Sequence, residues 1–201
     1  GSGACICAIA RPVFWLETLM WCTLNSVTAS RLAPLAVTLR AGEASDAPAI
    51  SKLMIAASER HVLPELSAAG QAHYLAQITP EQVTAKLEQS ASFRFYVAYA
   101  GDELVGVAAL KENAHLYHLF TNNQHHRRGI ARTLWQRVHQ DALAAGNPGL
   151  FTVNASRYAL PAYWRLGFLP LGPAAELNGI CFVPMAIRLT AAGENHVPDA
   201  A

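Results

Sequence analysis

Hydrophobic and polar positions alternate along two neighbouring stretches in the middle of the chain, FRFYVAYA (93–100) and ELVGVAALK (103–111). Alternation with a period of two is typical of strands, and the Gly-Asp pair between the stretches predicts a tight hairpin turn. Gly106 lies inside the second stretch, where a glycine indicates a bulge or the close approach of another element. Similar patterns predict the other strands, at 37–40, 115–121, 149–155, 168–172 and 179–189.

A helical repeat appears between the later strands. Over residues 129–144, apolar residues recur at every fourth position and form one stripe that faces a core: Ile130, Leu134, Val138 and Ala142. A shorter helix is predicted over 157–167, where Gly167 ends it.

Two start signals predict helices in the first half of the chain. Asp46 followed by Pro48 predicts a helix that runs to about residue 58, because Asp is a frequent N-cap and Pro fits the first turn. The sequence TPEQ (79–82) is a capping box that opens a helix to about residue 89. Between them, residues 59–70 contain a Pro and predict a loop with a short helix.

The predicted order is one strand, helices, three strands, a helix, a strand, a helix and final strands. A strand meander followed by a strand–helix–strand unit predicts an α/β fold in which helices cover both faces of a mixed sheet. A length of 201 residues suits one such domain, which we place at 37–190, with a tail at 191–201.

Composition narrows the class of protein. Hydrophobic residues make up 52% of the chain and charged residues 14%, which favours a large core and excludes disorder. A net charge of +1 argues against nucleic-acid binding, which needs a basic excess. The four cysteines show no metal-binding spacing and no disulfide framework, so we expect no metal, reduced thiols and a cytoplasmic location.

Residues 1–36 form a tag remnant, Gly-Ser-Gly, and an apolar extension. Its apolar run, 13–24, contains Glu17 and is shorter than the roughly 20 residues that span a bilayer, so we expect no stable membrane insertion. We favour a helix packed on the domain or on a second subunit, which makes a homodimer an option. Two alternatives stay open: a helix on a membrane surface, and sequence read through from a misplaced start. If the extension is a helix, its buried stripe could be Trp15, Leu19 and Cys22, or Met20, Thr23 and Val27.

Polar residues gather just before the helix at 129–144, in NNQHHRRGIARTLW (122–135). The first amides of a helix have no intrahelical partner, and the helix dipole adds partial positive charge there. Gly129 permits close approach to the backbone, and Arg127 and Arg128 add donors. The stretch therefore predicts a phosphate-binding turn, with an ordinary helix start and solvated arginines as the alternative.

Two motifs resemble those of one family. HRRGIA (126–131) resembles the pyrophosphate-binding loop of the GCN5-related N-acetyltransferases (GNAT), Gln/Arg-x-x-Gly-x-Gly/Ala, with His126 where Gln or Arg is usual. TVNASRYALPAYWRLGF (152–168) resembles the second signature of the family, a strand ending in Asn and a helix with Tyr-x-x-x-Gly-Phe. The predicted element order is also that of the family, and the resemblance covers 37–189. The residues that match are Gly129, Ala131, Asn154, Tyr163, Gly167 and Phe168.

The resemblance implies a mostly antiparallel sheet that is split between its fourth and fifth strands, with acetyl-CoA as cosubstrate in the split. The pyrophosphate would be bound along His126, Arg127, Arg128, Gly129, Ile130, Ala131 and Arg132. The backbone of Leu119, Phe120 and Thr121 would pair with the pantetheine arm, and Asn154 would bind that arm or order a water. Core packing of Phe120 and a turn role for Asn154 are the alternatives.

The resemblance also implies transfer of an acetyl group to a primary amine of a small molecule or peptide by direct attack. Tyr163 would protonate the departing thiolate, and His118, or less directly His115, would act as base. Glu59, His61 and Glu65 would line the acceptor pocket. The alternatives are that Tyr163 is a packed aromatic residue and that the strand histidine only makes structural hydrogen bonds. The residues of the acceptor pocket would then be solvated loop charges.

Other classes of function compete with this interpretation. A non-catalytic acyl-CoA-binding sensor or interaction domain would use the same loop, but the presence of Tyr163 favours an enzyme. A nucleotide-binding domain would need a complete G-x-G-x-x-G or a Gly-Lys-Ser/Thr motif, and the sequence has neither. A protein-interaction role of the N-terminal extension could coexist with the enzyme. No pattern selects the acceptor.

Overall fold

The computed structural model describes residues 33–189, so most of the predicted N-terminal extension (1–36) and all of the predicted C-terminal tail (191–201) lie outside the described residues. The strands are β1 (Thr38–Ala41), β2 (Phe93–Ala100), β3 (Glu103–Lys111), β4 (His115–Thr121), β5 (Leu150–Ala155), β6 (Leu169–Pro170), β7 (Ala175–Leu177) and β8 (Ile180–Arg188). The α-helices are α2 (Ala47–His61), α3 (Ala68–Ala76), α4 (Pro80–Glu88), α5 (Ile130–Ala144) and α6 (Leu160–Leu166). Single turns of 3₁₀-helix lie at η1 (Ala44–Asp46), η2 (Leu63–Glu65) and η3 (Asn123–His125).

The strands form one mixed sheet in the order β1-β2-β3-β4-β5-β8-β6, and β7 also pairs with β8. All of these pairs are antiparallel except β4–β5, which are parallel and share a single register position, His115 opposite Thr152. The side chains of these two residues also meet, with His115 Nδ1 2.8 Å from Thr152 Oγ1. The predicted split between the fourth and fifth strands is thus confirmed.

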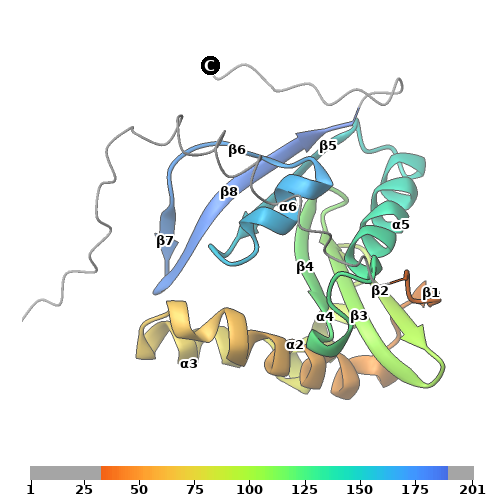
Figure 1. Ribbon diagram of the computed structural model, residues 1–201, viewed down its shortest axis with the longest axis horizontal. Coiled ribbons are helices and arrows are strands. Elements are labelled where there is room, and N and C mark those ends of the chain that lie inside the picture. Colours follow the sequence, from red (N-terminus) through yellow and green to blue (C-terminus); the bar gives the residue numbers. More distant parts are fainter. Residues whose placement is uncertain (1–32, 190–201) are drawn as a thin grey trace, which may run out of the picture. The chain divides into compact units, whose positions relative to one another are not determined.

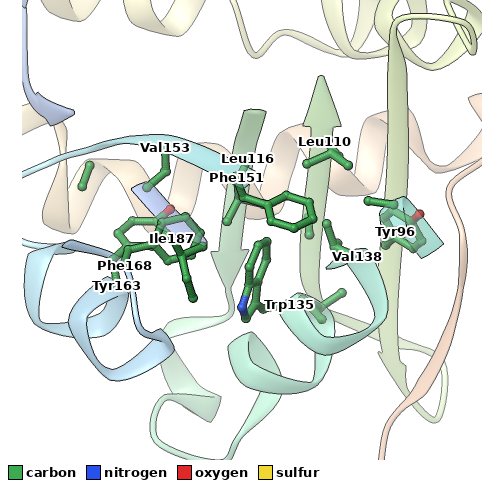
Figure 2. Packing of buried hydrophobic residues seen from close by; sticks show 14 of the residues in the cluster. Tyr96, Leu110, Leu116, Trp135, Val138, Phe151, Val153, Tyr163, Phe168 and Ile187 are labelled. Carbon is green, nitrogen blue, oxygen red and sulfur yellow. The ribbon is translucent and has the colours of Figure 1, made fainter. Parts of the chain in front are cut away.

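Helices cover both faces of the sheet, as predicted (Figure 1). α5 and α6 pack on one face, over a core that contains Trp135, Phe151 and Phe168. The ring of Trp135 meets Phe151 edge-on at 5.1 Å and Phe168 at 5.0 Å (Figure 2). α2 and α4 cover a second core on the opposite face, built on Ile50 and Met54.

The apolar stripe of α5 is buried as its spacing predicts, since Ile130, Leu134, Val138 and Ala142 are each at most 2% exposed. The helix approaches β3 closely at Gly106, where a Cβ would lie 2.7 Å from Ile130 Cγ2 and 2.9 Å from Leu134 Cδ1. The register with β2 also shifts beside Gly106. Gly106 therefore marks both a bulge and the close approach of another element, and its missing side chain lets α5 lie against the sheet.

Three features differ from the sequence-based predictions. α2 extends beyond residue 58 to His61, and α3 runs to Ala76, well past the loop predicted at 59–70. Strand β7 was not predicted. The third difference concerns Asp46, which precedes α2 but makes no side-chain cap to it.

Polar groups outside α2 bind the carboxylate of Asp46 instead. It accepts two hydrogen bonds of 2.7 Å from the guanidinium of Arg40, one of 2.9 Å from the hydroxyl of Tyr99 and one of 2.8 Å from the amide of Glu43. These charge-assisted bonds satisfy the carboxylate better than a helix cap would. Asp46 therefore fastens the start of α2 to β1 and β2.

The start of α3 is set by two contacts that local patterns do not show. Ser67 is its N-cap, because the hydroxyl accepts from the amide of Gly70 at 3.1 Å. Gly70 lies against the turn between β7 and β8, where a Cβ would overlap the carbonyl oxygen of Gly179. α3 therefore touches the far end of the β7–β8 hairpin (Figure 1). Among residues 33–189, no helix is both long and apolar enough to cross a membrane.

Candidate active site

The split between β4 and β5 leaves one edge of β4 without a strand partner in the described sheet beyond His115. Leu119, Phe120 and Thr121 pair with β3 on their other side. Unpaired peptide groups along such an edge can bind an extended ligand as an added strand. The residues predicted to bind the pantetheine arm lie at this edge, and the side chain of Phe120 packs against the core on the α2 side.

The turn before α5 leaves the start of the helix without a side-chain cap. Gly129 is the N-cap in the left-handed region, with φ 86°, and gives the helix no side-chain cap. The first bond into the helix from this turn runs from the amide of Thr133 to the carbonyl of Gly129, so the amides of Ile130, Ala131 and Arg132 precede the helical ladder. A Cβ on Gly129 would meet nothing within 4 Å, so the turn is open on that side of Gly129.

The arginines of this turn differ in their surroundings. Arg128 is held by the chain that precedes β1, because its Nε donates to Ala33 at 3.3 Å and its carbonyl accepts from the amide of Leu35 at 3.2 Å. Arg127 is exposed and takes a positive φ of 60°. Arg132 is also exposed, and its guanidinium lies 3.5 Å from the carbonyl of Arg165 on α6.

His126, the residue that departs from the family pattern, takes part in a stack of three rings. The imidazole of His61, at the end of α2, stacks with both other rings: its centroid is 3.8 Å from that of Tyr158 and 5.7 Å from that of His126. Burial and the neighbouring His126 lower the pKa of His61, which favours the neutral ring. The stack links α2 to the loops that follow β4 and β5.

The predicted acceptor residues separate into two places. Glu65 lies near His61, since its Oε1 accepts from the amide of Tyr158 at 3.2 Å. Glu59 instead lines a surface pocket with Lys52 and Pro80, on the side of α2 that meets α4. Glu59 is therefore not brought together with His61 and Glu65.

Tyr163 is buried on α6, with 8% of its surface exposed, and its ring meets Phe168 edge-on at 5.6 Å (Figure 2). Burial, followed by the nearby Tyr74, raises the pKa of its phenol. A raised pKa keeps the proton on the hydroxyl at neutral pH, as a proton donor requires. Asn154 lies exposed on β5, opposite Pro184 of β8.

The two histidines of β4 have different surroundings from those expected of a base. His115 bridges the two strands at the closed end of the split through Thr152. His118 is 9% exposed, and burial followed by the charge of Lys86 lowers its pKa to about 3. A weakly basic ring inside the core on the α2 side does not favour the predicted role of His118 as the base.

A hydrogen-bonded pair of polar residues on α2 and α3 was not identified from the sequence. The hydroxyl of Tyr74, on α3, lies 2.9 Å from that of Ser58, on α2. Burial raises the pKa of Tyr74 to about 12. The sequence signal for α3 was weak, because Gly70 stands where a capping box has Glu or Gln, three residues after Ser67.

Comparison with known proteins places this geometry in a family. The model of the acetyltransferase (GNAT) domain matches residues 62–189, which is more than half of the chain. No curated protein matches the chain.

Solved structures share the fold at low sequence identity. A GCN5-related N-acetyltransferase from Rhodopseudomonas palustris is 21% identical with a TM-score of 0.64, over 78% of this chain and 96% of that one. The PaiA N-acetyltransferase from Thermoplasma acidophilum, in complex with coenzyme A, is 16% identical with a TM-score of 0.62, over 75% and 98%. A mutant of the spermidine N-acetyltransferase SpeG from Vibrio cholerae is 21% identical with a TM-score of 0.55, over 76% and 93%. The domain match, supported by the shared fold, shows that the chain belongs to the GNAT family of acetyltransferases.

Proposed function

We propose that the chain transfers the acetyl group of acetyl-CoA to a primary amine of a small molecule or peptide. The observation that carries this proposal is the open turn at Gly129, where uncapped amides of α5 lie next to the unpaired edge of β4. Such a turn suits a pyrophosphate, and the edge suits an extended pantetheine arm. The coenzyme A bound to the Thermoplasma acidophilum neighbour supports the cosubstrate, and the spermidine N-acetyltransferase supports an amine acceptor.

The reaction assigned here is a direct transfer. The amine nitrogen attacks the thioester carbon, a C–N bond forms, and the C–S bond breaks as coenzyme A leaves as a thiolate. As the amide forms, the nitrogen releases one proton to solvent. Tyr163 donates its phenolic proton to the sulfur, and the phenolate then regains a proton from solvent. Since the pKa of the phenol is raised by burial, the protonated form is available at neutral pH.

The amine must lose a proton as well, because an alkylamine in water has a pKa near 10.4 and is mostly protonated. We do not assign this step to His118, because a base with a pKa of about 3 accepts a proton poorly at neutral pH. Desolvation in the split lowers the pKa of a bound amine and favours its reactive neutral form.

Binding of the cosubstrate is the first test. We expect acetyl-CoA to raise the melting temperature, whereas ATP and NADH do not. A ligand at 100 times its Kd stabilises by about 2.7 kcal/mol, and each kcal/mol raises the melting temperature of a chain of this size by about 2–4 °C. No shift with acetyl-CoA would contradict the proposal.

The role of Tyr163 is tested separately. Tyr163→Phe should reduce turnover at least about tenfold, the low end of what a general acid contributes, with acetyl-CoA binding nearly unchanged. Unchanged turnover would remove Tyr163 from the mechanism. Acetyl-CoA binding without turnover on any amine would favour a non-catalytic CoA-binding domain.

A further inference from the structure

The turn before α5 (residues 126–129) has a backbone conformation that is unfavourable for part of its sequence. Arg127 has a φ of 60° and Gly129 a φ of 86°, so both lie in the left-handed region. Glycine adopts this region readily, whereas an arginine there is strained, because its Cβ crowds the backbone. Strain of this kind persists where the surrounding structure holds the backbone in place. The contacts of the turn with other elements therefore maintain its shape.

The end of the turn is held by the chain that precedes β1. The amide of Leu35 donates to the carbonyl of Arg128 at 3.2 Å, and Nε of Arg128 donates to the carbonyl of Ala33 at 3.3 Å. These bonds hold the residue that follows the strained Arg127. They do not involve His126, which precedes it.

The start of the turn is held from α2 through a ring contact. The imidazole of His126 stacks with that of His61, in the last turn of α2, at 5.7 Å between centroids. Burial and the neighbouring His126 lower the pKa of His61, so the two rings can stack at neutral pH without repulsion between two cations. Nearby, Nδ2 of Asn123 donates to the carbonyl of Ala56 at 3.3 Å. α2 therefore supports this loop at two points, Ala56 and His61.

His61 also contacts the loop that follows β5. Its ring lies 3.8 Å from that of Tyr158, and the amide of Tyr158 donates to Oε1 of Glu65, just beyond α2, at 3.2 Å. β4 and β5 pair only where His115 lies opposite Thr152, so strand pairing does not fix the spacing of the loops that follow them. His61 therefore joins two loops that the strands leave apart.

We propose that His61 is a positioning residue for the cosubstrate, and that it acts through His126 to hold the strained turn in the shape that binds the pyrophosphate of acetyl-CoA. This inference rests on the proposed function. A site that is ordered before its ligand arrives binds more tightly, because binding does not have to supply the cost of ordering it. Without the ring of His61, the turn can relax at Arg127, and the amides at the start of α5 must be ordered again when the pyrophosphate binds.

Calorimetric titration with acetyl-CoA tests the inference without relying on turnover. His61→Ala should raise the Kd for acetyl-CoA at least about fivefold, within the range by which contacting residues influence one another. His61→Phe keeps a ring that can stack and should bind within about twofold of wild type. Rescue by Phe separates stacking from any role of the imidazole in hydrogen bonding or proton transfer.

A double-mutant cycle tests whether His61 acts through His126. His126→Ala should also weaken binding, and adding His61→Ala to it should have little further effect, because the contact is already lost. Tyr158→Ala removes the nearer ring partner of His61 and should weaken binding in the same direction. His73→Ala is the matched control, since His73 is an exposed histidine in the last turn of α3 and contacts no other ring within residues 33–189.

The control should bind acetyl-CoA as wild type does. The inference is overturned if His61→Ala binds as tightly as wild type, or if His61→Phe binds as weakly as His61→Ala. Fully additive losses in the double variant overturn it as well, because His61 would then act independently of His126. A wild-type chain that does not bind acetyl-CoA overturns the proposed function itself.

Discussion

The imidazole of His61 lies flat on the phenol ring of Tyr158, with centroids 3.8 Å apart and ring planes 9° apart. His61 ends α2, and Tyr158 lies in the loop between β5 and α6. His61 also stacks with His126, at 5.7 Å between centroids, and His126 is the one position at which the loop before α5 departs from the GNAT pattern. The departure is therefore accompanied by a ring contact that a Gln or Arg would not make in the same way.

We predict that this stack holds the loop before α6 in place. His61→Ala should increase the rate of tryptic cleavage after the exposed Arg157 severalfold, because the Tyr158 ring loses its partner and local opening becomes easier. Mass analysis of the fragment that begins at Tyr158 measures the effect. His61→Phe preserves a stacking ring and should cleave near the wild-type rate, so equal cleavage in the Ala and Phe variants would contradict the prediction.

A second prediction concerns the contact between β3 and α5. Gly106→Ala should lower the free energy of unfolding by about 1–3 kcal/mol, since its Cβ would lie 2.7 Å from Ile130 and 2.9 Å from Leu134 in a packed core. Denaturant titration measures the loss. Gly172→Ala is the control, because a Cβ there meets nothing within 4 Å, and it should change stability little. Equal stability of both variants would mean that α5 does not approach the sheet at Gly106.

The elements that were predicted well carry their signal in local periodicity. The strands at 93–100, 103–111 and 115–121 and the buried stripe of α5 follow from alternation and from the helical repeat. Several of the contacts that were missed join residues far apart along the chain. Asp46 and Tyr99 are 53 residues apart, and Glu65 and Tyr158 are 93 apart. No window of local sequence contains both partners of either bond.

The candidate site also divides into residues that local patterns identified and residues whose surroundings local patterns did not show. The motif residues around Gly129 and Tyr163 were found because each motif is short and contiguous. The surroundings of His118 could not be derived from alternation, because the bulge at Tyr117 breaks the period of two. Leu116 consequently packs in the core under α5, while His118 lies against Phe95 and Phe120 on the opposite side of the sheet.

A third prediction concerns Asp46. The hydrogen bonds from Arg40, with smaller contributions from Glu43 and Tyr99, lower the pKa of its carboxyl to about 2. Because the folded-state pKa is depressed, the stabilisation is present above the unfolded pKa near 3.9 and is lost as the pH falls toward 2. Asp46→Asn should reduce the free energy of unfolding at pH 7 by about 2 kcal/mol, the scale of charged hydrogen bonds.

Unfolding titrations at pH 7 and pH 3 measure this effect. The difference between wild type and Asp46→Asn should shrink at the lower pH. Asp141→Asn is the matched control, because it breaks an exposed helical pair with Arg137 at 2.8 Å and should cost much less. A pH-independent difference would show that the charge of Asp46 does not account for its contribution.

The contact between α3 and the β7–β8 turn gives the last prediction. Ala is favoured over Gly inside a helix by about 1 kcal/mol, so Gly70→Ala would stabilise an isolated α3. In the folded chain the new Cβ would overlap the carbonyl oxygen of Gly179, and a backbone atom cannot rotate away as a side chain can. We therefore expect the opposite sign, a loss of about 1–3 kcal/mol in denaturant titration.

Ala69→Gly separates the two contributions to that change. Ala69 is the exposed neighbour of Gly70 in the same helical turn, so its substitution should cost about 1 kcal/mol through helix propensity alone. If Gly70→Ala stabilises the chain while Ala69→Gly destabilises it, propensity governs both positions and α3 does not touch the hairpin. If both variants lose stability, the backbone contact at Gly179 outweighs propensity and anchors the helix that carries Tyr74.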